Sequence, residues 1–169
     1  YEIPPKSNAN YAWILNMISK LSQNGVAGFI LANGALSGGG EEYKIRKQII
    51  ENDLVEAVVI LPQDMFYSTN ISVTLWILNR NKNERTFEVN DGVKNYRDRK
   101  GEVLFMDLRQ KGEPFEKKYI QFGEEEITAI ATHYHNWQQQ DWKVTYQDIP
   151  EYSYSATLEE KKKKDYSLV

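Results

Sequence analysis

The sequence has 169 residues, of which 41% are hydrophobic and 27% charged, with a formal net charge of −3 at pH 7. This length predicts one domain with a substantial core, and the composition excludes a disordered chain. The absence of cysteine excludes disulfides and thiolate chemistry, and the slightly acidic balance argues against a domain that holds nucleic acid by itself. No apolar run approaches the roughly 20 residues of a membrane helix, and no secretory signal is present, so we expect a cytoplasmic protein without membrane contact.

The first half of the chain alternates helical and strand patterns. "NANYAWILNMISKLSQNG" has apolar residues at spacings of three and four, which predicts a helix. "VAGFILA" predicts a strand buried on both faces. A Gly-rich turn then leads into a second amphipathic helix, "EEYKIRKQIIEN". Two further apolar runs, Leu54 to Leu61 and Ser72 to Leu78, predict two more strands.

The connections between these elements predict their directions. The first two strands are joined through a helix, so they should be parallel. The third strand follows a loop too short to hold a crossover helix, so it should be antiparallel. The result is an α/β fold with a mostly parallel sheet, one antiparallel strand and helices on its faces.

The second half begins with a polar segment. Residues 80–101 are rich in charge, with a turn signal at Asp91-Gly92, and predict a surface excursion. "GEVLFMDLR" predicts an added strand and "EEEITAIATHYHNWQQ" a C-terminal helix. Residues 141–169 have no clear period and predict an irregular tail, which ends in a solvated charged helix or a disordered stub.

Few residues form a plausible catalytic or ligand site. "SGGGEE" lacks the lysine of a P-loop, and its two glutamates would repel an anion, so it is better interpreted as a mobile loop. His133 and His135 point apart on a helix, which argues against a shared metal. The run "EEKKKK" is most simply a solvated face. We find no catalytic constellation, no metal site and no cofactor-binding residues.

The segment "ILPQDMFYSTNIS" is the exception, because it places Met65, Phe66 and Tyr67 in a loop. These side chains could fold back under the sheet as a small hydrophobic cluster. Alternatively they could stand at the carboxyl end of a parallel strand, where open α/β sheets place their ligands. A planar ligand such as a nucleobase could stack there.

The same block carries a family resemblance. "IPPKSNANYAWILNMISKLSQNGVAGFILANGAL" and "GGGEEYKIRKQIIENDLVEAVVILPQDMFYSTNISVTLWILNRNK" resemble the modification (M) subunit of type I restriction-modification systems, a DNA adenine-N6 methyltransferase. "GEVLFMDLR" and "YSATLEEKKKKDYSLV" are also similar to that family. The resemblance covers nearly the whole chain.

The resemblance implies a fold and a domain boundary. It implies a partial Rossmann-like methyltransferase sheet, whose last three strands in sequence lie side by side with the final one reversed between the other two. The family's Gly-rich motif for S-adenosylmethionine and its Asn-Pro-Pro-aromatic motif are not in this sequence, since Pro4-Pro5 is followed by Lys6. Residues 1–140 would then be the second half of a methyltransferase domain, and residues 141–169 would lead to a missing C-terminal region. We interpret both ends as cuts in a longer protein.

The resemblance also implies a site and partners. Phe66 would form a wall of the target-base pocket, Leu61 and Pro62 its rim, and Thr69 and Asn70 would offer polar contacts. Related families place the stacking aromatic beside the proline, at the position of Leu61, so Phe66 and Leu61 both stay candidates. The cofactor would be S-adenosylmethionine, and the partners would be DNA, the DNA-specificity subunit and the restriction subunit.

The chain alone is expected to be inactive, because the catalytic motif is absent. The alternative is a noncatalytic module that docks the specificity subunit or the rest of its own domain. In that case "VAGFILA" would present an unpaired edge, which could also support a homodimer.

Overall fold

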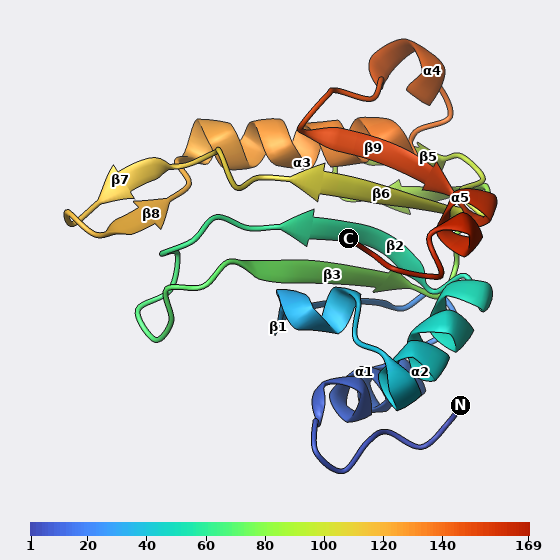
Figure 1. Cartoon of the computed structure of the whole chain (residues 1–169). Helices are drawn as coiled ribbons and strands as arrows, with labels where there is room; N and C mark the ends of the chain where they lie inside the picture. The colour runs from blue at the N-terminus through green and yellow to red at the C-terminus, as the bar shows by residue number, and fades with distance from the viewer.

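A five-stranded sheet organises the molecule, with the strands in the order β1-β3-β2-β6-β9 (Figure 1). The computed structural model describes residues 1–169. The strands of this sheet are β1 (Val26–Ala32), β2 (Val55–Ile60), β3 (Val73–Asn79), β6 (Glu102–Asp107) and β9 (Ser153–Thr157).

The strand directions confirm the predicted connections. β3 is antiparallel to both β1 and β2, so it lies reversed between two parallel strands. β2 pairs in parallel with β6, the strand predicted from "GEVLFMDLR". β9 adds a second reversed strand at the far edge, antiparallel to β6. The sheet is therefore mixed, with β1, β2 and β6 pointing the same way.

Two local predictions are wrong. β1 is an edge strand rather than a strand buried on both faces, and Val26 and Ile30 are 55% and 46% exposed. Its hydrophobic run does not distinguish an edge from a centre, because a short apolar strand fits either position. The tail from residue 141 is also ordered: it forms α4 (Trp142–Thr145), β9 and α5 (Leu158–Lys163), and β9 is fixed by pairing with β6.

Helices cover the two faces of the sheet. α1 (Asn10–Lys20) and α2 (Gly40–Glu51) lie over one face, α3 (Glu124–Gln138) over the other (Figure 1). The first hydrophobic cluster comprises Tyr11, Ile14, Ile18, Ala35, Leu36, Ile45, Ile49, Ile50, Leu54, Val55, Val58, Trp76, Leu78, Val103, Tyr166 and Leu168. The second comprises Ala57, Val59, Leu61, Val73, Leu104, Met106, Leu108, Trp137 and Tyr146. None of the helices is both long enough and apolar enough to span a bilayer.

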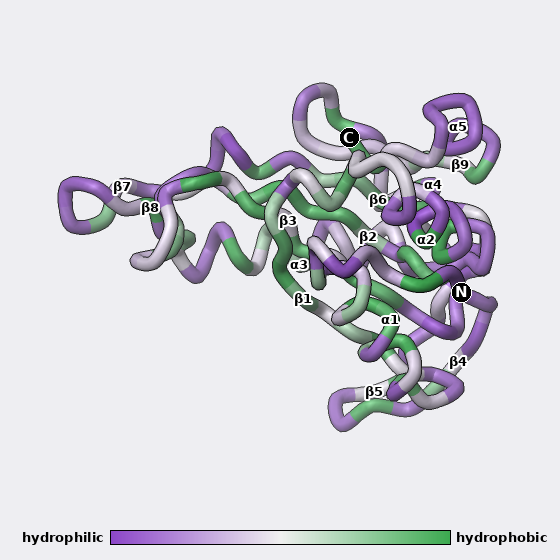
Figure 2. The backbone as a smooth tube through the Cα atoms, turned by 60° about the horizontal axis from the view of Figure 1, so that its bottom comes forward, coloured by the Kyte–Doolittle hydropathy of each residue, from purple (hydrophilic) through white to green (hydrophobic).

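Two small hairpins project from this core. β4 (Arg85–Val89) and β5 (Gly92–Tyr96) form one, with its turn at the predicted Asp91-Gly92 signal. β7 (Glu113–Phe115) and β8 (Tyr119–Gln121) form the other. Figure 2 shows hydrophobic residues concentrated in the central strands and a hydrophilic tip on the β7–β8 hairpin.

The base of the 80–101 excursion is buried, contrary to the predicted surface segment. Lys82, Arg97 and Arg99 are 3%, 6% and 0% exposed. Burial of such cations is unfavourable unless they are paired. Each one is paired: Lys82 with Asp53 at 2.7 Å, Arg97 with Glu102 at 2.5 Å, and Arg99 with Glu56 at 2.6 Å.

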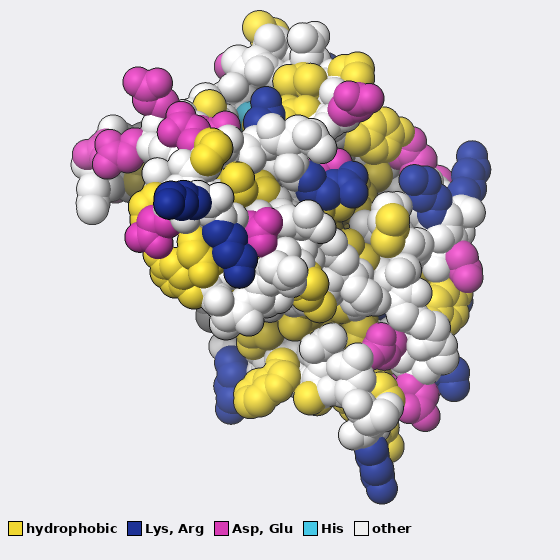
Figure 3. Space-filling view, turned by 60° about the vertical axis from the view of Figure 1, so that its left-hand side comes forward, with side chains coloured by type: hydrophobic (Ala, Val, Ile, Leu, Met, Phe, Trp, Pro, Cys, Tyr) yellow, Lys and Arg dark blue, Asp and Glu magenta, His cyan; other side chains and the backbone are white.

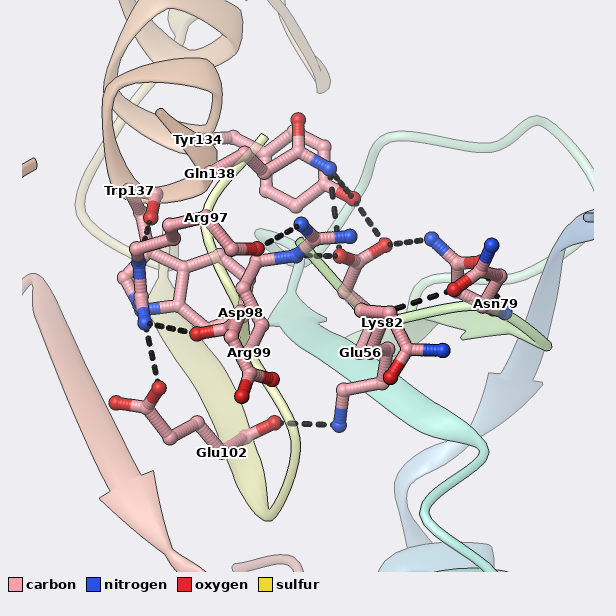
Figure 4. Close-up of polar contacts among 12 residues, drawn as sticks. Glu56, Asn79, Lys82, Arg97, Asp98, Arg99, Glu102, Tyr134, Trp137 and Gln138 are labelled. Atoms are coloured by element: carbon pink, nitrogen blue, oxygen red, sulfur yellow. Dashed lines mark hydrogen bonds and ion pairs between the residues drawn. The ribbon is translucent and has the colours of Figure 1, made fainter. Parts of the chain in front are cut away.

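Glu56 is the centre of this network (Figure 4). Its fully buried carboxylate accepts hydrogen bonds from Arg99 Nε at 2.6 Å, Asn79 Nδ2 at 2.8 Å, Tyr134 Oη at 2.8 Å and Gln138 Nε2 at 3.3 Å. Burial by itself would raise the pKa of Glu56, but the Arg99 charge and these donors outweigh it and hold the pKa below its ordinary value. The network therefore joins β2, β3, α3 and the base of the excursion.

We expect Arg99→Met to lower the free energy of unfolding at pH 7 by about 3–5 kcal/mol, because it leaves a buried carboxylate without its cation. The depressed pKa of Glu56 means that its stabilising contribution is present above the unfolded-state pKa of about 4.3 and is lost as the pH falls through the folded-state pKa. The difference in free energy of unfolding between the wild type and Arg99→Met should therefore become smaller in acid. Urea unfolding of both 169-residue chains at several pH values measures this difference. The exposed Lys100→Met is the control, and an equal loss in both variants would contradict the assignment.

Candidate functional site

The loop from Leu61 to Ser72 and the β7–β8 hairpin lie at the same end of the sheet, beyond the carboxyl ends of β2 and β6 (Figure 1). A backbone hydrogen bond from Ile120 N to Asp64 O at 2.9 Å joins them. Open α/β sheets bind their ligands in crevices at this edge, because neighbouring strand ends direct their loops there. The two segments together form the candidate site.

The loop is closed by its own backbone. Asp64 N donates to Asn70 O and Thr69 N donates to Phe66 O, both at 3.4 Å. Asp64 has a φ of 60°, in the left-handed region that Asp and Asn adopt more readily than most residues. Ser72 Oγ donates to Leu61 O at 2.6 Å, which fixes the base of the loop. The loop therefore presents its side chains from a defined backbone.

A cavity of about 310 Å³ lies between the loop and the hairpin. This volume is in the range of small-ligand pockets, which begin at about 300 Å³. Its lining residues are Asp64, Phe66, Tyr67, Ser68, Thr69, Asn70, Lys118 and Tyr119.

Phe66 has two environments at once. It is half-buried and packs against the second hydrophobic cluster, and it also lines the cavity. Its neighbour Met65 packs against the same cluster without lining the cavity, whereas Tyr67 is 73% exposed and lines it. Each of the two predicted alternatives for this loop therefore holds for part of it. Met65 and Phe66 pack against the hydrophobic cluster, and Phe66 and Tyr67 line the cavity.

The other predicted site residues divide into two groups. Leu61 is 8% exposed, belongs to the second cluster and, like the buried Pro62, does not line the cavity. Thr69 is half-buried, Asn70 is exposed, and both line it. Of the two candidates for the stacking residue, Phe66 is the one at the cavity.

The hairpin contributes residues that the sequence analysis missed. The rings of Tyr67 and Tyr119 meet edge to face with centroids 4.7 Å apart, and Lys118 Nζ lies 5.6 Å from the Tyr119 ring. Lys118 and Tyr119 belong to a segment for which no element was predicted. Strands of three residues are too short to show an alternating pattern in the sequence. Only the adjacent charged and aromatic side chains of Lys118 and Tyr119 could have indicated this part of the site.

A larger cavity of about 870 Å³ lies on the sheet, lined by Val58, Ile60 and Phe105 on one side and by residues of the tail on the other. Its lining includes the Asp107–Arg109 pair, in which Arg109 Nε and Nη2 donate to the carboxylate at 2.9 and 2.6 Å. These charges already satisfy each other. Because the loop after β2 lines the smaller cavity, we place the candidate site there.

The remaining sequence candidates have other partners. Gly38 and Gly39 precede α2, whose first turn carries Glu41 and Glu42. A Cβ on Gly38 would lie 2.0 Å from the Glu42 carboxylate, so an acid occupies the space beside this turn. The turn does not fit the carboxylate of S-adenosylmethionine, and we assign no cofactor contact to this chain. His133 Nε2 lies 2.7 Å from Ser153 Oγ, and His135 Nδ1 lies 2.9 Å from Gln138 Oε1.

The sheet order and the site define the class of protein. A reversed β3 between parallel β1 and β2 is the arrangement of the closing strands of a Rossmann-like methyltransferase sheet, and the loop after β2 faces the ligand edge. The family model of N-6 DNA methylases matches residues 1–169. The chain therefore belongs to the N-6 DNA methylase family.

Individual relatives agree with this assignment. The chain is 43% identical over 169 residues to the type I restriction enzyme HindI methylase subunit of Haemophilus influenzae, covering 99% of this chain and 34% of that protein. It is 36% identical over 167 residues to the MjaVII methylase subunit of Methanocaldococcus jannaschii, covering 98% and 25%. The crystal structure of a type I restriction-modification methyltransferase subunit from Streptococcus thermophilus matches with a TM-score of 0.77 and 28% identity, covering 99% and 30%. The chain thus spans about a third or less of these relatives.

Proposed function

We propose that this chain is the second half of the methyltransferase domain of a type I restriction-modification modification subunit, and that it forms the target-adenine side of the active site. The full subunit would methylate adenine N6 in DNA with S-adenosylmethionine as methyl donor. The observation that supports this most directly is the position of Phe66, half-buried beside a cavity of about 310 Å³ at the carboxyl end of β2. Family membership supports the reaction class.

The proposed role of the loop follows from the geometry of duplex DNA. An adenine inside the duplex cannot reach an enclosed methyl donor, so the base must rotate out of the stack, at a cost of a few kcal/mol. Stacking on an aromatic ring contributes about 1–3 kcal/mol per base and offsets part of that cost. Phe66 would supply this surface, Thr69 and Asn70 the polar contacts, and the buried Leu61 and Pro62 would brace the loop from below. We assign no residue of this chain to the methyl transfer itself.

The proposed partners follow from the same assignment. The substrate would be DNA, with the recognition sequence read by a separate specificity subunit, and a restriction subunit would join the assembly. The complex would act in the cytoplasm. The slightly acidic chain needs such an assembly, because its own charge does not favour DNA phosphates.

We expect Phe66→Ala in the full-length subunit, assembled with its specificity subunit, to lower methylation by about 5- to 100-fold, because it removes base–aromatic stacking. The extruded base can be followed with 2-aminopurine at the target position, whose fluorescence should fall in step. Met65→Ala is the matched control, since Met65 packs against the same cluster but does not line the cavity. Equal activity of the Phe66→Ala variant and the wild type would remove the stacking role.

The 169-residue chain by itself should transfer no methyl group to DNA. The reason is that the motifs to which we attribute methyl-donor binding and activation of the amine are absent from this sequence. The measurement is incorporation of labelled methyl groups into unmethylated DNA, with the protein purified from a strain that lacks adenine methyltransferases. Incorporation above that of a mock preparation would show that the transfer machinery is present in this chain.

A noncatalytic docking module is the second candidate. The open edge of β1 favours it, because an edge strand offers unpaired backbone groups to another strand, and Val26 and Ile30 are exposed beside it. The occupant would be the remainder of the domain, the specificity subunit or a second copy of the chain.

Self-association of the isolated chain tests this edge. Light scattering should show a dimer whose population rises with concentration, and Ile30→Lys should shift it toward monomer, because a charge on an exposed edge opposes strand pairing. Lys20→Ala, on α1, is the control. A wild-type chain that stays monomeric at all accessible concentrations would contradict self-pairing through β1.

A further inference from the structure

The β7–β8 hairpin is held in a defined position. Its turn comprises residues 116–118, between the paired Phe115 and Tyr119, and Glu116 and Lys117 have left-handed φ values of 49° and 65°. Gly112 has a φ of 95°, and a Cβ there would lie 2.4 Å from Ile120 Cγ2. The glycine therefore lets the chain pass close to β8. The hairpin is thus a structured element, although it projects from the core (Figure 2).

The hairpin and the loop after β2 form one surface. The backbone bond between Ile120 and Asp64 ties them together, and the Tyr67–Tyr119 ring contact closes the side of the cavity. Figure 3 has this end of the molecule turned forward, and basic, acidic and hydrophobic side chains are interspersed there. A ligand that reaches Phe66 therefore also meets the hairpin.

The lining of the cavity is rich in hydrogen-bond donors. Those of its residues that can donate are Tyr67, Ser68, Thr69, Asn70, Lys118 and Tyr119. Thr69 Oγ1 accepts from Ile71 N at 3.3 Å, which leaves its own hydroxyl hydrogen to donate outward. Lys118 is exposed, and the ion pairs of the molecule do not include it. Donors of this kind suit a ligand that consists mainly of acceptor oxygens.

We propose that the β7–β8 hairpin binds the sugar–phosphate backbone of the DNA strand that carries the displaced adenine, with Lys118 contacting a phosphate and the Tyr67–Tyr119 pair bordering the same nucleotide. This inference rests on the proposed function and adds the hairpin to the DNA-binding surface. Phosphate contacts fix the register of a protein on DNA without reading sequence. The hairpin would therefore position the strand so that the displaced base meets Phe66.

One acidic side chain gives the proposal a second test. Asp64 lines the cavity and, like Lys118, takes part in no ion pair. A phosphate held by Lys118 would be repelled by this carboxylate. Asp64→Asn removes the charge, and Asn tolerates the left-handed backbone of this position as well as Asp does.

The experiment measures the salt dependence of DNA binding by the full-length subunit assembled with its specificity subunit. For Lys118→Gln, the slope of log association constant against log salt concentration should decrease in magnitude by about 0.7–0.9, the value for one lost phosphate contact. Lys117→Gln is the matched control, because it removes the same charge from the exposed turn but does not line the cavity, so its slope should equal that of the wild type. Asp64→Asn should bind severalfold more tightly at low salt.

The outcomes separate this inference from the proposed function. An unchanged slope for Lys118→Gln, equal decreases for Lys117→Gln and Lys118→Gln, or weaker binding by Asp64→Asn would each overturn the hairpin contact. Methylation by the wild-type complex that depends on Phe66 would leave the proposed function standing in all three cases. A wild-type complex that neither binds nor methylates DNA would instead contradict the proposed function. Matching thermal unfolding of the three variants verifies that each one is folded.

Discussion

Glu56 sits on the central strand β2 with no exposed surface, so its negative charge must be balanced inside the protein. The balance comes from Arg99 at the end of the excursion, from Asn79 on β3 and from Tyr134 on α3. Each partner belongs to a different segment. If one of them moved away, the buried carboxylate would lose a hydrogen bond that water could not replace. This one constraint therefore fixes how α3 and the excursion sit against the sheet. It also raises the pKa of Tyr134, through burial and the neighbouring Glu56 charge.

The same arrangement separates the charged network from the end of the sheet that carries the candidate site. The charged network lies near the start of β2, and the loop from Leu61 to Ser72 leaves the other end of the same strand. Because β2 is buried along nearly its whole length, its position is set by both hydrophobic clusters and by the ion pair. A loop that leaves such a strand has a fixed origin, which the proposed stacking role of Phe66 requires. The position of the β7–β8 hairpin is set in the same way, because the hairpin follows β6, which pairs in parallel with β2.

The boundary between hydrophobic support and polar site runs through the loop itself. Leu61 and Met65 face the second cluster, Phe66 touches both sides, and the residues from Tyr67 to Asn70 face the cavity. The placement of Met65, Phe66 and Tyr67 in one loop is explained by these two environments, the hydrophobic cluster and the cavity. Part of the segment anchors the loop, and the rest lines the cavity.

Much of this protein could be predicted from local pattern. The apolar runs located the strands, the short link after β2 predicted the reversal of β3, and Asp91-Gly92 marked a hairpin turn, because periodicity and turn chemistry depend on near neighbours. The loop that lines the smaller cavity was also identifiable as a candidate site, since Phe66 follows a parallel strand. Tertiary structure alone decided the rest. Glu56 lies 43 residues from Arg99 and 78 from Tyr134, β9 is a strand because β6 offers it an edge, and Tyr119 meets Tyr67 across the cavity. A charged or aromatic residue looks the same in sequence whether it is solvated or paired, and only the fold brings its partner near enough to make burial favourable.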